Sequence, residues 1–169
     1  TRGQVEFFLR TRGRTLAELQ LRQDVLDDAL RTVSAAIPAD WRRGWVERGD
    51  LSRFDFEPGD VVLVVGPDGL VANTAKYLHD QPLLGVDPEP GRNPGVLVRH
   101  RASEVARLLA DLLLGRAAVQ ARTMVRATAD DGAVLDALND IYLGDAGHQS
   151  ARYRLRLADG RVEVQSSSG

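Results

Sequence analysis

The first regular pattern of apolar positions in the chain is helical and lies between Thr15 and Pro38. Thr15 is followed three positions later by Glu18, which is the arrangement of a capping box at a helix start. Proline cannot continue a helix, so the pattern ends at Pro38. The sequence therefore predicts a long amphipathic helix with one face on a core. Its apolar positions are Leu16, Leu19, Leu26, Leu30, Val33 and Ile37.

A different pattern, continuous rather than periodic, occupies residues 61–65. The run Val-Val-Leu-Val-Val is rich in β-branched residues and is bounded by Asp60 and Gly66, which is typical of a strand buried on both faces of a parallel sheet. Residues 66–69 read as a glycine turn, 70–78 as a short helix and 82–86 as a second strand. Together these segments predict a βαβ unit. Between 40 and 59 we expect a loop whose aromatic side chains cover a core edge: Trp41, Trp45, Phe54 and Phe56.

After a further predicted strand at 95–98 and a helix over 103–115, the pattern changes to alternation. Residues 123–127 and 134–143 read as strands, and 152–157 and 161–165 as a hairpin joined by Asp159-Gly160. The predicted fold class is thus α/β. A Rossmann-like parallel-sheet domain spans 1–116, and an antiparallel β domain spans 117–169. We expect that β domain to be incomplete in this chain, since four strands with an apolar face need a partner.

Composition narrows the possible functions. The 169 residues include 22 basic and 24 acidic ones, a net charge of −2, so we expect neither a nucleic-acid partner nor a membrane surface. There is no cysteine, and the three histidines (His79, His100, His148) show no ligand spacing, so no metal site is expected. No apolar run is long enough to span a bilayer and no signal peptide is visible, which favours a cytoplasmic protein.

The strongest candidate for chemistry is the turn Gly66-Pro67-Asp68-Gly69 after the buried strand. A glycine-bearing loop between a strand and a helix can direct backbone N–H groups at a phosphate, and ligands of open α/β sheets favour this edge. The same four residues also suit a plain turn. Pro67 has no N–H to contribute.

The second candidate is Asn139-Asp140, which lies inside an apolar run. Polar residues in a strand are costly to bury unless they are satisfied, so a ligand, a bulge or a sheet edge would each explain them. Three arginines alternate along the later hairpin: Arg152, Arg154 and Arg156. They predict either a solvated sheet face or, at Arg152, a phosphate contact.

Taken together, these segments resemble the NAD kinases. Residues 61–78 (VVLVVGPDGLVANTAKYL) resemble that family's strand, Gly-Gly-Asp-Gly-Thr loop and helix, and 82–97 (PLLGVDPEPGRNPGVL) resemble its Pro-Ile-Leu-Gly-Ile-Asn…Gly-Phe-Leu stretch. Residues 137–143 (ALNDIYL) resemble its Ala-Leu-Asn-Glu-Val segment. The three segments occur in the family's order. The ending QSSSG is similar to the stretch before the family's second ligand loop.

The resemblance implies roles for particular residues. It implies that Gly66 and Gly69 belong to a phosphate loop, and that Asp68 contacts the ribose and acts as general base toward the 2′-hydroxyl. Asn139 and Asp140 would hold NAD, with Arg152 as a looser match. The implied reaction transfers a phosphoryl group from ATP, with Mg²⁺, to the 2′-hydroxyl of the adenosine ribose of NAD. The family is commonly dimeric or tetrameric, which implies a homo-oligomer.

Departures from the family pattern keep two other functions open. Pro67 replaces a glycine, Leu70 replaces the threonine, and Asp87 stands at the position of an asparagine. Loss of one preorganised donor can cost roughly 3 kcal/mol of transition-state stabilisation. One alternative is therefore a non-catalytic NAD(P)-binding regulatory protein. The other is a lipid or sugar kinase, because such kinases share the Gly-x-Asp-Gly loop.

Overall fold

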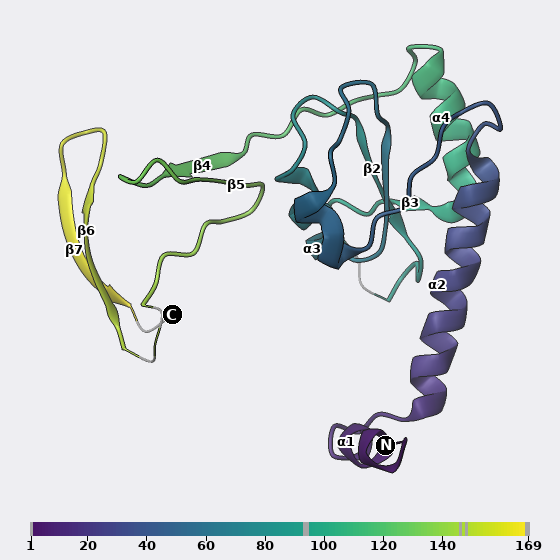
Figure 1. The fold of residues 1–169 in the computed structure, drawn as a ribbon, viewed down its shortest axis with the longest axis horizontal. Coiled ribbons are helices and arrows are strands. Elements are labelled where there is room, and N and C mark those ends of the chain that lie inside the picture. The colour runs from purple at the N-terminus through teal and green to yellow at the C-terminus, as the bar shows by residue number, and fades with distance from the viewer. Residues whose placement is uncertain (1, 93–94, 146, 148, 168–169) are drawn as a thin grey trace. The chain divides into compact units, whose positions relative to one another are not determined.

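The computed structural model (Figure 1) describes residues 2–92, 95–145, 147 and 149–167. The chain divides into two compact units, residues 1–123 and residues 124–169. The boundary predicted from the change of pattern, between 116 and 117, lies seven residues before this division.

Two helices open the first unit. Helix α1 (Arg2–Arg10) lies at the end of α2 that points away from the sheet (Figure 1), and α2 (Leu16–Ala36) is the predicted long helix. The capping box is confirmed. The Glu18 amide donates to the Thr15 hydroxyl oxygen at 3.1 Å, and the Thr15 amide donates to the Glu18 carboxylate at 2.9 Å. Two amides at the helix start are thereby satisfied.

A three-stranded parallel sheet forms the centre of this unit. Its order is β1 (Val62–Val65), β2 (Leu83–Asp87) and β3 (His100–Arg101). Helix α3 (Asp68–Ala75) connects β1 to β2, as the βαβ pattern predicts. The connection from β2 to β3 contains no helix among its described residues. The sequence pattern predicts a strand over 95–98, but this segment is not one. The third strand of the sheet begins two residues after this segment, at His100.

The sheet is covered by helices on both faces, which explains the unbroken apolar run before Gly66. Alternate residues of that run, Val61, Leu63 and Val65, contact a core whose buried members come from α2, β2 and α4: Val33, Val86, Val105 and Leu109. On the other face, Val64 packs with Val71 of α3 and with Val98. Since both faces of the sheet pack against helices, every position of the run can be apolar, although only Val64 is buried.

The remaining elements of the first unit are short. A 3₁₀ helix, η1 (Arg48–Arg53), lies within the predicted loop, and a second one, η2 (Ala102–Glu104), leads into α4 (Val105–Leu113). Buried Gln81 ties the loop to the sheet, because its side-chain amide donates to the carbonyls of Phe56 and Glu57 at 3.3 and 3.2 Å. Its side-chain oxygen accepts from the His79 amide at 2.8 Å.

The second unit consists of two separate antiparallel ribbons rather than one sheet. Strands β4 (Val125–Thr128) and β5 (Val134–Ala137) form the first ribbon, and β6 (Ala151–Arg156) and β7 (Val162–Ser167) form the second. The Asp-Gly hairpin is confirmed, with Gly160 at φ +86° in its turn. The strand predicted over 134–143 ends at Ala137, so its second half is not paired.

The chain is therefore a mixed α/β protein with one small parallel sheet and two antiparallel ones. Within the part that the structure describes, no helix is long and apolar enough to cross a membrane.

Replacing Leu109 should destabilise the first unit. Leu109 is 2% exposed in the core between α4 and the sheet, so Leu109→Ala leaves a cavity and should cost about 3 kcal/mol of unfolding free energy. Urea unfolding followed by circular dichroism measures the change. Leu113→Ala is the matched control on the same helix, because Leu113 is 60% exposed and its loss should cost much less. Equal losses would contradict this placement of the core.

Candidate functional site

The candidate phosphate loop lies where β1 ends and α3 begins. Gly66 is buried, and its amide donates to the Val86 carbonyl of β2 at 3.0 Å, which fixes the end of β1. A Cβ at Gly66 would lie 3.0 Å from Cδ2 of Leu70, so the turn is tight. Helix α3 begins at Asp68, after Pro67. The turn therefore places Asp68 and Gly69 in the first helical turn, at the carboxyl end of a buried parallel strand.

The Asp68 carboxylate is held by three backbone amides from a distant segment. Its Oδ2 accepts from the Val96 amide at 2.8 Å, and its Oδ1 accepts from the amides of Leu97 and Val98, both at 2.9 Å. Hydrogen bonds to an ionised acceptor are stronger than neutral ones. Asp68 thus joins the loop after β1 to the segment that precedes β3.

Two glycines make this approach possible. A Cβ at Gly95 would collide with the Asp68 carboxylate, and a Cβ at Gly85 in β2 would collide with the Leu97 carbonyl. Reasoning from the sequence missed both roles. Gly95 does stand in the Gly-Val-Leu stretch that resembles the family, but no spacing rule shows which distant carboxylate a glycine must accommodate.

These contacts determine the protonation of Asp68. Partial burial raises the pKa of this carboxyl, but the amides of Val96, Leu97 and Val98 and the charge of Arg99 lower it. The net effect is a pKa below the ordinary value of 3.8. Asp68 is accordingly an anion at neutral pH and a weak proton acceptor, which suits it to orient a hydroxyl more than to deprotonate one.

The site retains capacity for a ligand. A carboxylate offers about four acceptor positions, and the amides occupy two on Oδ1 and one on Oδ2, so Oδ2 can accept one further hydrogen bond. Gly69 is exposed, and a Cβ there would meet nothing within 4 Å. A hydroxyl donor and an anion therefore both have access to the first turn of α3.

The other predicted site residues lie in the second unit. Asn139 and Asp140 are exposed and follow the end of β5. Because these side chains are in contact with water, their polar groups do not need a ligand to satisfy their hydrogen bonds. Arg152, Arg154 and Arg156 share one exposed face of β6. Within the described residues, none of these five side chains makes a hydrogen bond or an ion pair, whereas Arg126 pairs with Asp136 at 2.7 Å.

No group of three or more acidic, histidine or cysteine residues able to hold a metal ion occurs among the described residues. His79 is exposed, His100 lies in β3, and His148 falls outside the described residues. Asp87 uses its Oδ1 to accept from the Glu89 amide at 2.9 Å.

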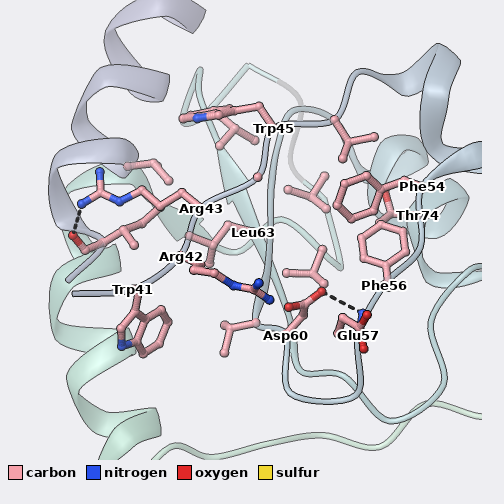
Figure 2. A pocket seen from close by; sticks show the side chains of 18 of the residues that line it. Trp41, Arg42, Arg43, Trp45, Phe54, Phe56, Glu57, Asp60, Leu63 and Thr74 are labelled. Carbon is pink, nitrogen blue, oxygen red and sulfur yellow. Dashed lines mark hydrogen bonds between the residues drawn. The ribbon is translucent and has the colours of Figure 1, made fainter. Parts of the chain in front are cut away.

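A cavity of the first unit lies elsewhere, along β1 (Figure 2). It measures about 1080 Å³, and its lining does not include Asp68. Its aromatic walls come from the loop that the sequence assigns to a core edge: Trp41, Trp45, Phe54 and Phe56.

Comparisons with models of protein families, with curated proteins and with solved structures find no match to this chain. The resemblance to the NAD kinases therefore stays a hypothesis that rests on the three quoted segments.

Replacing Gly95 should break the contact between Asp68 and the 96–98 segment. The added methyl group of Gly95→Ala must displace either the carboxylate or the backbone, at a cost of about 2 kcal/mol. Thermal or urea unfolding measures the loss. Gly69→Ala is the control, because its Cβ points into open space and alanine favours a helix. A Gly95→Ala protein as stable as its Gly69→Ala counterpart would refute the close approach.

The contribution of Asp68 to stability should depend on pH. Because its pKa is lower in the folded state, the stabilisation is fully present above the unfolded value of 3.8 and is lost as the pH falls through the lower folded value. The difference in melting temperature between the native protein and Asp68→Asn should therefore shrink in acid. Melting curves from pH 7 down to about pH 2 measure it. A difference that stays constant over this range would contradict the three amide contacts.

Proposed function

We propose that this chain carries the nucleotide loop and part of the substrate site of a NAD kinase-like phosphotransferase. The reaction transfers the terminal phosphoryl group of ATP to the 2′-hydroxyl of the adenosine ribose of NAD and yields NADP. The observation that carries the proposal is Asp68, fixed by three amides at the end of a buried parallel strand with one acceptor position left on Oδ2. The ordered resemblance of residues 61–78, 82–97 and 137–143 supplies the identity of the substrate.

In this proposal Asp68 accepts a hydrogen bond from the ribose hydroxyl and orients its oxygen toward the terminal phosphorus. The new O–P bond forms as the bond to the bridging oxygen breaks, ADP leaves, and the hydroxyl proton passes to Oδ2 or to water. Phosphoryl transfer relies on positioning more than on a strong base, so a lowered pKa at Asp68 is compatible with it. Magnesium bound to the nucleotide supplies charge neutralisation.

The remaining residues would bind rather than react. Gly66 keeps the turn tight, Gly69 leaves room for a phosphate at the start of α3, and Asn139, Asp140 and Arg152 would contact NAD. We further propose that the parallel sheet, with helices on both faces, is a Rossmann-like nucleotide-binding arrangement. The proposed enzyme is cytoplasmic and homo-oligomeric, and its exposed strands in the second unit would be covered in the oligomer.

A second candidate, a non-catalytic NAD(P)-binding protein, is favoured by Leu70. Its side chain packs with the apolar cluster of Val64, Val71 and Val98 and offers no hydroxyl to a phosphate. Pro67 likewise contributes no amide. Such a protein would bind dinucleotide without turnover. A lipid or sugar kinase would instead show turnover with those acceptors.

The test is an assay for NADP formed from NAD, ATP and Mg²⁺ by the purified protein, with calorimetry of NAD binding in parallel. Asp68→Asn should lower kcat by about a hundredfold or more, because the residue contacts the reacting hydroxyl. Asp80→Asn is the matched control, because Asp80 is an exposed carboxylate of the same unit outside the turn of residues 66–69, and its replacement should leave activity unchanged.

Binding without product in a folded protein would refute the kinase and favour the regulatory alternative. Turnover of lipid or sugar acceptors without NADP formation would instead favour a lipid or sugar kinase. Equal activity of the native protein and Asp68→Asn would exclude Asp68 from the reaction.

A further inference from the structure

Strand β1 has an outer edge with which no described strand pairs, and this feature plays no part in the proposed reaction. In the sheet order β1-β2-β3, β1 is an outer strand, and its only described strand partner is β2. Natural edge strands are usually protected by charges, prolines or bulges. Residues 61–65 have none of these and carry apolar side chains on both faces, which is the character of a central strand.

The backbone groups on this edge have no hydrogen-bond partner among the described residues. The amides of Val62 and Gly66 donate to the carbonyls of Pro82 and Val86 at 2.9 and 3.0 Å, on the side of β2. Because successive residues of a strand alternate, the amide and carbonyl groups of Leu63 and Val65 point the other way, toward the cavity. Both residues are half-buried. Water or another stretch of backbone can supply their hydrogen bonds, and a paired strand would satisfy all of them at once.

The cavity along β1, which we call the slot, has room for one further strand beside β1. Its lining includes side chains from both faces of β1, Val61 to Val65, so it wraps around the strand edge. Apolar residues of α2 and α4 close it on one side of the sheet, and Leu70 and Thr74 of α3 close it on the other. A five-residue strand is about 17 Å long. A strand in the slot would therefore extend the sheet and lie between the same helices that cover β1.

A second unpaired stretch of backbone lies across the slot. Residues 42–46 belong to no helix or strand and make no backbone hydrogen bond with another described residue. The segment is held instead through Arg43, whose guanidinium donates to the carbonyls of Ser34 and Ile37 at 3.2 and 3.0 Å. Figure 2 shows Trp41 and Trp45 along this segment, with Leu63 of β1 facing the same space.

The charged part of the slot lining is mixed. Three carboxylates (Asp55, Glu57, Asp60) and three guanidinium groups (Arg42, Arg43, Arg48) line it. The Glu57 amide donates to Asp60 at 2.9 Å, which holds the loop before β1 in place. The chemistry of a segment that fits here is therefore set by the apolar lining and by the outward backbone groups of β1 rather than by net charge.

We propose that the slot binds an apolar β-strand of about five residues from a polypeptide segment outside residues 1–169, which pairs with the outer edge of β1 through backbone hydrogen bonds. A small apolar ligand would leave the outward backbone groups of β1 unpaired. A second copy of this chain is a poor donor, since each described strand of its second unit contains a charged or strongly polar residue, as in the run Arg152, Arg154 and Arg156.

The two tryptophans of the chain, Trp41 and Trp45, both line the slot and report on it directly. The probe is a synthetic peptide with five central valines and isoleucines and an N-terminal pair of lysines. We expect a saturable shift of tryptophan emission to shorter wavelength at one peptide per chain, together with a higher melting temperature. The same peptide with alternate backbone amides methylated should bind at least tenfold more weakly.

Gly44→Leu should plug the slot, since a Cβ at Gly44 points to Phe54 at 3.5 Å, and should weaken peptide binding at least tenfold. Gly49→Leu is the matched control, because Gly49 is exposed, does not line the slot and has open space around its Cβ. No saturable shift, or equal binding of the methylated peptide, would overturn the proposal. A tryptophan shift that follows protein concentration alone, with dimers in sedimentation, would assign the slot to a second copy and also overturn it.

Discussion

The contact between the Asp68 carboxylate and the amides of residues 96–98 is the interaction on which the rest of the first unit depends. It joins the turn after β1 to a segment about thirty residues later, as the bond to the Val98 amide shows. Parallel strands are usually connected by a helix that packs on the sheet, but the described part of the connection between β2 and β3 contains none. The hydrogen bonds to Asp68 hold this connection against the sheet instead. Val98, which the contact positions, completes the apolar cluster with Val64 and Val71.

The same contact constrains the chemistry. A carboxylate that accepts three amide hydrogen bonds is stabilised as the anion, and its pKa falls accordingly. Such a group orients and polarises a donor more readily than it removes a proton. The proposed kinase would therefore depend on positioning, which suits phosphoryl transfer.

Local patterns predicted the parts of the fold that depend on local physics. The capping box of Thr15 and Glu18, the doubly buried strand before Gly66 and the Asp-Gly hairpin all follow from short-range rules, and the structure contains them. The candidate loop was found in the same way, from a glycine turn after a buried strand.

The parts that depend on distant partners were not predictable. Gly95 must be small because of a carboxylate far away in the chain, and no periodicity encodes that. Residues 138–143 are apolar enough for a strand, but a strand forms only where a neighbour offers hydrogen bonds, and β5 ends at Ala137. For the same reason, the apolar run of residues 61–65 predicted a strand packed on both faces, but it did not predict that the outer edge of β1 has no strand partner among the described residues.

Amide hydrogen exchange of Val96, Leu97 and Val98, measured by NMR in the native protein and in Asp68→Asn, tests the central claim most directly. The account predicts that all three amides exchange slowly in the native protein, since each donates to one carboxylate. It also predicts that they exchange much faster in Asp68→Asn, while amides in β2 keep their protection. Fast exchange of these amides in the native protein, or unchanged exchange in the variant, would contradict it.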